Sequence, residues 1–308
     1  TPPAVIRSPV LDDASIERER ALLALGAREA RTSPWYATLV AARRALYEPS
    51  HPLVSRLVTE VPEHADREVI RTWHTRALGR ARLGIVVVGD VDPSAVVRTA
   101  RSVFSDATEE EPHDPPAPPS RRAPSEPIVV PTSAESASIL VLARAPTLRD
   151  RDAWCGLALL ARILGGMFVS PINLELRERR DESYGVSTDY DAGSRHGELS
   201  ISVTVPAEQA DDTLALLRAE IGRARSEVPH PELFATAQAI AREELAAALE
   251  SRRGLADVLL GAYLLGAEPE DRAEHGLGIR PDMRGFAGRM GVLGGGGRGG
   301  ARGRVGIA

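Results

Sequence analysis

The chain has 308 residues, a formal net charge of −5 and 43% hydrophobic residues. This length suits one large domain or two smaller ones, and the hydrophobic content excludes a chain that is disordered throughout. The mild acidity argues against nucleic acid as the main partner. The single cysteine, Cys155, excludes an intrachain disulfide and a cysteine-rich metal site.

The remaining composition says little about the compartment. Every basic residue is an arginine, which together with the many alanines is typical of a high-GC bacterial genome. No apolar run is long enough to predict a membrane span, and no signal peptide is recognisable at Thr1. The cytoplasm and a periplasm without disulfides therefore both remain open.

The first third of the chain reads as helices followed by one strand–turn–helix unit. Apolar spacing and cap residues predict three helices, over 15–30, 33–46 and 65–78. The run RLGIVVV at 82–88 predicts a buried strand, and the sequence GDVDP then turns into a helix that ends near Phe104. Asp90 and Asp92 could bind a cation, but two carboxylates in such a turn more often cap the next helix.

A proline- and acid-rich segment divides the chain. Residues 106–127, DATEEEPHDPPAPPSRRAPSEP, have no apolar face and predict a linker between two domains. A long surface loop is the alternative.

Residues 291–308 are rich in glycine and arginine and predict a flexible tail. Such runs can bind RNA weakly, but this one is short and has no aromatic residue.

The second part predicts a sheet with helices on one face, an α+β layer. Its elements are expected in the order strand 138–143, helix 150–164, strand 183–190, strand 198–205, and helices 207–225, 233–249 and 253–265. The segments 1–104 and 128–265 could be two versions of one such unit, although no residue-level repeat proves it.

The most informative stretch is 162–187, RILGGMFVSPINLELRERRDESYGVS. Gly165 and Gly166 are expected to end the apolar helix, and Ser170-Pro171 is a typical start of a short second helix, with the serine side chain as its cap. Arg177 falls in the last turn of that helix, and Tyr184 opens the strand that follows.

This pattern, LGG…S-x-x-N-x-x-L-R-E-x-R-x-x-x-Y-G, resembles the second-domain signature of the pitrilysin/insulinase family of inverted zinc peptidases. The resemblance implies that Arg177 and Tyr184 contact peptide substrate near the scissile bond, from the half of the molecule that carries no zinc. Without the resemblance, a solvated helix-end arginine and a core tyrosine would be the simpler interpretation.

The strand–GDVDP–helix unit is similar to the last strand and helix of the family's first domain. The resemblance therefore implies an α+β fold with two related domains of mixed sheet covered by helices, the first incomplete at its N-terminus. The expected division is a first domain at 1–105, a linker at 106–127, a second domain at 128–290 and the tail at 291–308.

The metal motif of the family is missing. Neither H-x-x-E-H nor H-E-x-x-H occurs in the sequence, and the nearest match, Glu63-His64, follows Pro62 and is expected in a loop. Where the resemblance places a third zinc ligand, the chain has Leu25 and Gly26, while Glu29 is out of register by about a turn. No G-x-S-x-G motif or P-loop is present either.

We therefore expect a zinc-less homologue that acts as the non-catalytic subunit of a two-chain peptidase. Its partners would be a zinc-bearing subunit of the same family and a peptide substrate, and the chain itself would hold no metal or other cofactor. Two alternatives remain: a C-terminal fragment of a complete zinc peptidase, and a scaffold protein that has lost peptidase function.

Overall fold

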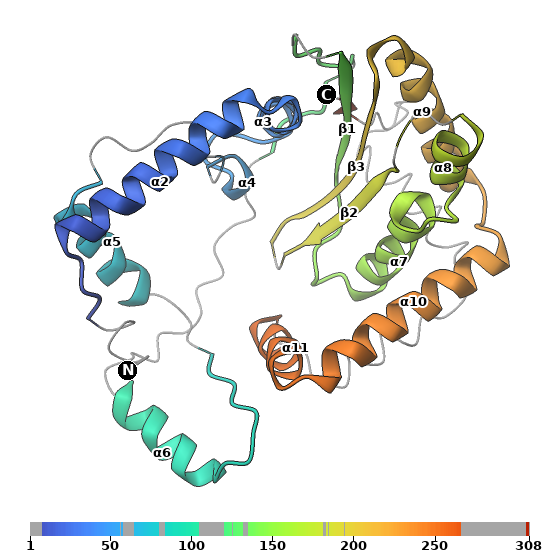
Figure 1. Cartoon of the computed structure of the whole chain (residues 1–308). Helices are drawn as coiled ribbons and strands as arrows, with labels where there is room; N and C mark the ends of the chain where they lie inside the picture. Colours follow the sequence, from blue (N-terminus) through green and yellow to red (C-terminus); the bar gives the residue numbers. More distant parts are fainter. Residues whose placement is uncertain are drawn as a thin grey trace. The chain divides into compact units, whose positions relative to one another are not determined.

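The computed structural model of the chain (Figure 1) describes residues 8–55, 57, 65–79, 84–104, 120–124, 126–131, 135–180, 183, 185–193, 195–265 and 306–307. The chain divides into two compact units, which are described separately. Unit 1 comprises Thr1–Thr32, Val58–Pro116 and Ala248–Leu264, and unit 2 comprises Ser33–Leu57, Ala117–Ala247 and Leu265–Ala308.

Unit 2 is built on an antiparallel sheet with the strand order β2-β3-β1-β4. The strands are β1 (Ser136–Arg144), β2 (Ser187–Ala192), β3 (Gly197–Pro206) and the two-residue β4 (Gly306–Ile307). In the register of the central pair, Val141 lies opposite Ile201 and Ile139 opposite Val203.

The expected α+β class and both central strands are confirmed. The strand expected from 183 begins only at Ser187. Apart from β4, the predicted tail lies outside the described residues.

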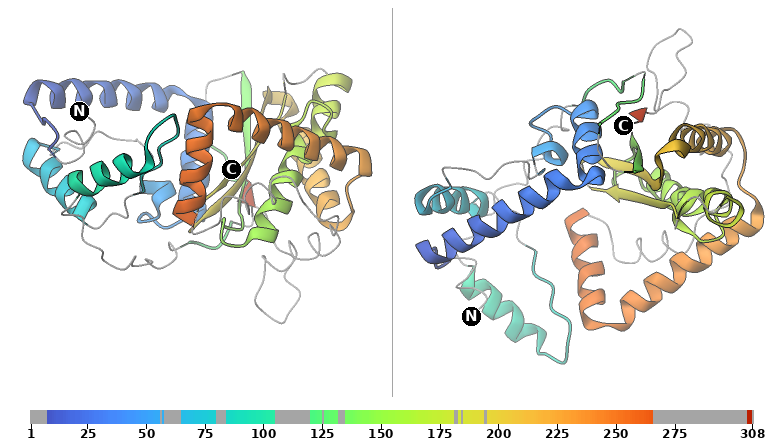
Figure 2. Two further views of the ribbon diagram at one scale, coloured as in Figure 1. Left: turned by 90° about the horizontal axis from the view of Figure 1, so that it is seen from below. Right: turned by 45° about the horizontal axis from the view of Figure 1, so that its top comes forward.

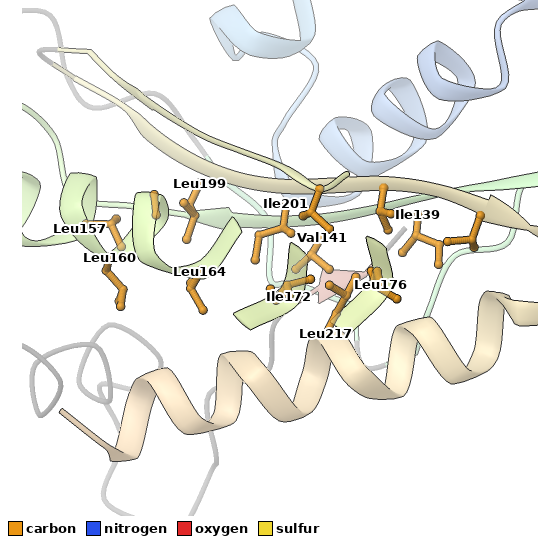
Figure 3. Packing of buried hydrophobic residues seen from close by; sticks show 14 residues of the cluster. Ile139, Val141, Leu157, Leu160, Leu164, Ile172, Leu176, Leu199, Ile201 and Leu217 are labelled. Carbon is orange, nitrogen blue, oxygen red and sulfur yellow. The ribbon is translucent and has the colours of Figure 1, made fainter. Parts of the chain in front are cut away.

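One face of this sheet is covered by the helices on which the candidate site lies. α7 (Arg151–Ala161) continues into a π-helical turn, η1 (Arg162–Gly166). A short helix follows, α8 (Pro171–Asn173) with the π-helical η2 (Leu174–Arg179), and after β3 comes η3 (Ala207–Gln209) with α9 (Ala210–Ser226). Figure 3 shows the buried core between them, to which the sheet contributes Ile139, Val141, Leu199 and Ile201, and the helices contribute Leu157, Leu160, Leu164, Ile172, Leu176 and Leu217.

The opposite face of β1 is covered as well, by α3 (Pro34–Leu46) and α4 (Pro52–Ser55). Leu140 and Leu142, which alternate with the residues of the first core, pack there against Leu46 and Leu53, and Figure 2 shows the strands between α3 and the green helices. The expectation of cover on one face only is therefore corrected. The continuous apolar run of β1 is the reason, since a strand buried on both faces needs apolar residues at consecutive positions.

α10 (Pro231–Glu250) packs against the outer side of α7 through Leu233, Phe234 and Ala237. The pair is fixed by Arg162, whose Nη1 donates a 2.9 Å hydrogen bond to Glu244 Oε1. The helical stretch Ala153–Arg179 reaches the length and mean hydropathy (1.7) of a membrane span, so the sequence-based statement that no run is long enough is wrong on that criterion. Because 67% of its most apolar part is buried inside the protein, core packing accounts for the same composition.

Unit 1 contains α2 (Asp13–Thr32), α5 (Arg67–Gly79), α6 (Pro93–Val103) and most of α11 (Arg252–Leu265). The Asp92 carboxylate accepts a 2.9 Å bond from Ser94 N and so caps α6, as expected. The strand predicted over 82–88 is not found: residues 84–88 form no strand, and Ile85 and Val87 are 48% and 49% exposed. An apolar run becomes a strand only beside a second strand, and no described residue pairs with it.

The second predicted helix, which the sequence placed in the first domain, lies with unit 2 as α3. Ser33 caps it, accepting a 3.3 Å hydrogen bond from Tyr36 N, and Pro34 occupies its first turn. The linker expected at 106–127 is described only in part, from Ser120 onward, so the domain boundaries themselves stay a prediction.

Candidate functional site

The site begins with a close approach between a helix end and a strand. Gly165 lies in η1, and a Cβ atom at this position would overlap Thr188 Oγ1 of β2 and lie 3.0 Å from Val186 Cγ1. A Cβ on the neighbouring Gly166 would meet nothing closer than 3.5 Å. Gly165 is therefore required for packing, in addition to the role in helix termination that the sequence suggested.

Asn173 holds the turn between the two helices in place. Its Nδ2 donates to Gly165 O and Met167 O, both at 2.9 Å, and its Oδ1 accepts a 2.7 Å bond from Val186 N. The side chain is 4% exposed, and it satisfies backbone groups on both sides of the motif. Asn173 is part of the S-x-x-N pattern, but the pattern alone did not indicate its role. It is the only asparagine in the chain.

Ser170 differs from its expected role. It occupies the N-cap position of α8 with extended backbone angles, but its hydroxyl makes no cap hydrogen bond. The fully buried Oγ accepts instead from Asn173 Nδ2, at 3.2 Å. Pro171 has no backbone N–H to donate in the first turn. The Ser170 hydroxyl instead binds the buried side-chain amide of Asn173.

Arg177 lies in the last turn of η2, as predicted. Its guanidinium carbon is 5.0 Å from the centroid of the Phe168 ring, a cation–π distance, and its Nε is 3.5 Å from Glu178 Oε1. The side chain is 42% exposed. Because a guanidinium has five N–H donors, this exposure leaves donors directed at solvent.

The neighbouring arginines are used differently. Arg179 Nη1 and Arg180 Nε each bind the Glu175 carboxylate at 2.9 Å. These hydrogen bonds, with Arg180 as the larger contributor, hold the pKa of Glu175 below its usual value. Arg179 and Arg180 therefore neutralise a carboxylate on their own helix.

Exposed apolar side chains lie close to Arg177 in the sequence, and one of them, Phe168, contacts it. Phe168 is 78% exposed, Val169 47% and Leu174 38%. We call this set, together with Arg177, the hairpin surface. It combines large exposed apolar groups with a cation. Phe168 and Val169 follow the π-helical turn η1, and Leu174 and Arg177 lie within η2; such turns occur frequently at functional sites.

Tyr184, the second predicted contact residue, lies outside the described residues. The chain on either side of it is held by short-range contacts. Ser183 Oγ accepts from Gly185 N at 3.2 Å, and Gly185 has φ +153°, which favours glycine. The substrate contact expected of Tyr184 stays a prediction.

The described residues do not form a zinc site. No three His, Cys, Asp or Glu side chains among them come together in a way that could hold a metal. His51 and His196 lie with ring centroids 5.9 Å apart but without a third ligand, and the Glu63-His64 motif is outside the described ranges. Leu25, Gly26 and Glu29 are all exposed on α2. The described residues thus do not fit the family's metal, and no step is assigned to zinc on them.

An α+β layer that carries this motif, in a sequence without H-x-x-E-H, defines a non-catalytic domain of the inverted-zincin type. Residues 64–241 match the family described as "Peptidase M16 inactive domain". Because the match covers more than half of the chain, the protein belongs to that family, and the pitrilysin-type resemblance is confirmed.

Solved structures have the same fold. A peptidase M16 inactive domain from Pseudomonas fluorescens matches with a TM-score of 0.68 and 20% identity over 94% of this chain and 66% of that one. A protease from Helicobacter pylori matches with a TM-score of 0.74 and 14% identity over 93% and 71%. A chain of complex III from Candida albicans matches with a TM-score of 0.61 and 14% identity over 90% and 67%.

These identities establish the fold alone. The chain spans just under two thirds of the length of the Pseudomonas fluorescens structure. No curated protein matches it by sequence.

Proposed function

We propose that this chain is the non-catalytic partner of a zinc-bearing M16-type peptidase subunit, and that its hairpin surface binds the peptide substrate. The family assignment and the absence of a zinc motif from the sequence support the non-catalytic role. Substrate binding at the hairpin surface rests on one observation above all. Arg177 is exposed over Phe168, while both neighbouring arginines bind Glu175.

In this proposal the guanidinium of Arg177 donates hydrogen bonds to carbonyl or carboxylate oxygens of the peptide, and Phe168, Val169 and Leu174 contact its apolar side chains. Asn173 fixes the turn so that these groups are already in place before the peptide arrives, which lowers the entropy lost on binding. The Tyr184 hydroxyl, by resemblance, donates to the developing oxyanion. Bond cleavage takes place on the partner subunit.

The experiment is a reconstitution with an H-x-x-E-H-bearing M16 subunit and a fluorogenic peptide. Arg177→Ala is expected to lower kcat/KM of the pair at least 10-fold, about 1.4 kcal/mol of transition-state binding. Arg179→Ala is the matched control, because Arg179 is 74% exposed on the same helix and pairs with Glu175. Its kcat/KM should stay within twofold of wild type.

Two outcomes would count against the proposal. Equal activity of the wild-type and Arg177→Ala pairs would favour a scaffold that makes no substrate contact. Cleavage by this chain without a partner, in metal-containing buffer, would mean that the chain is itself a metallopeptidase.

A further inference from the structure

A buried cluster of two histidines joins the α3–α4 segment to the sheet of unit 2. The rings of Tyr47 and His51 stack with centroids 4.1 Å apart and an interplanar angle of 26°. His51 meets His196, from the connection between β2 and β3, edge to face at 5.9 Å. Tyr47 and His51 are each 2% exposed. The segment is thus anchored through aromatic rings, two of which are imidazoles.

Charged groups surround His51 on several elements. Arg43 of α3 binds Glu198 of β3, with Nη2 2.6 Å from Oε1 and Nε 3.1 Å from the same oxygen. The other titratable or charged groups around the cluster are Glu48 paired with Arg121, Arg144 at the end of β1, and Tyr47, whose pKa is raised chiefly by burial. The Glu198 carboxylate is thus already paired with Arg43. Both Arg43 and the second imidazole, His196, oppose a positive charge on His51.

His51 is held in its neutral form by its hydrogen bond. Its Nδ1 accepts a 3.1 Å bond from Leu53 N at the start of α4, so this nitrogen carries no proton. Protonation would break that bond and would place a buried positive charge next to His196 and Arg43. Burial, then His196, then Arg43 lower the pKa of His51 below its usual 6.5.

We propose that His51 is an acid-sensitive latch: its protonation undocks the α3–α4 segment, residues 33–57, from the outer face of the sheet. Undocking would uncover Leu140 and Leu142 of β1 and separate Arg43 from Glu198. The rest of unit 2 would stay folded, because the core on the other face of the sheet does not use this segment.

The direction follows from proton linkage. The docked state binds fewer protons at His51 than the undocked state, so docking is strongest above pH 6.5 and weakens as the pH falls below that value. One proton changes the docking equilibrium at most about tenfold per pH unit. His196, which opposes a positive charge on His51, is only half-buried.

The test is hydrogen exchange on the full chain at pH 7.5 and 5.5, corrected for the intrinsic pH dependence of exchange. Peptides from 33–57 should lose protection by up to about tenfold at pH 5.5, while peptides from 136–144, whose amides pair with β3, and from 231–250 should change little. His51→Asn, whose Oδ1 can accept from Leu53 N, should lose less than threefold. His230→Asn is the matched control, because His230 is 67% exposed, and it should behave as wild type.

The inference is overturned if wild-type protection in 33–57 is the same at both pH values, if His51→Asn loses as much protection as wild type, or if 231–250 opens together with the segment. Should His51→Asn not fold, His196→Gln provides the second variant. It keeps His51 and removes one opposing charge, so the midpoint of undocking should move to lower pH. An unchanged midpoint would contradict the latch.

Discussion

Asn173 and Val186 are joined by a 2.7 Å hydrogen bond from Val186 N to Asn173 Oδ1, across thirteen residues of sequence. The same amide group binds two carbonyls of the turn before α8. One side chain therefore connects the end of the core helix, the short helix that bears Arg177 and the entry to β2. This connection holds the short helix on which Arg177 lies.

Asn173→Ala should destabilise the protein by about 3 kcal/mol, because it leaves the Val186 N–H and two carbonyl groups buried without a partner. Urea denaturation of the wild type and the variant measures this. Asn173→Asp distinguishes the accepted bond from the donated bonds. An aspartate can still accept from Val186 N, but it cannot donate to Gly165 O and Met167 O. If Asp were tolerated as well as Asn, the bonds to Gly165 and Met167 would not matter.

Gly165→Ala and Gly166→Ala form a matched pair of neighbouring glycines in one π-helical turn. The first should cost about 1–3 kcal/mol, because its methyl group overlaps Thr188 Oγ1, and the second should be close to neutral, because its nearest contact is 3.5 Å. Thermal unfolding distinguishes them. Adding Thr188→Ala should restore part of the loss in Gly165→Ala, and independent, additive effects of the two changes would rule out the overlap.

Phe168→Leu tests whether the ring orients Arg177. A cation–π contact at an exposed site contributes roughly 0.5–1 kcal/mol, so kcat/KM of the reconstituted pair should fall about two- to fivefold with little change in stability. In an Arg177→Ala background the same substitution should have a smaller effect. If both backgrounds lose activity equally, Phe168 acts independently of the guanidinium.

Arg43→Ala should destabilise unit 2 by about 3 kcal/mol, because it leaves the Glu198 carboxylate, 4% exposed, without its cation. Arg253→Ala is the comparison, since its pair with Asp257 spans 3.8 Å between side chains that are 93% and 69% exposed. That variant should change stability by less than about 0.5 kcal/mol. Equal effects in chemical denaturation would mean that the buried pair contributes no more than a surface pair.

The elements whose signals are local were predictable from sequence. α3 begins where Ser33-Pro34 predicted, and β3 alternates buried and partly exposed residues as its Leu199–Val205 pattern indicated. The end of the core helix at Gly165–Gly166 was also predicted. In each case neighbouring residues carry the information.

Features that depend on distant residues were not predictable in this way. The packing of Leu46 on Leu142 joins positions almost a hundred residues apart, so the cover on the second face of β1 was missed. Residues 84–88 have the composition of a strand but no described neighbour with which to pair. The roles of Asn173 and Phe168 depend on a turn geometry that spacing alone does not specify.

The most direct test of the account measures zinc content and peptide cleavage, first on the purified chain and then on its mixture with an H-x-x-E-H-bearing M16 subunit. We expect no stoichiometric zinc and no cleavage by the chain alone. We expect the mixture to cleave the peptide faster than the partner by itself, and this gain to depend on Arg177. Stoichiometric zinc together with cleavage by the chain alone would contradict it, and this chain would then be a metallopeptidase in its own right.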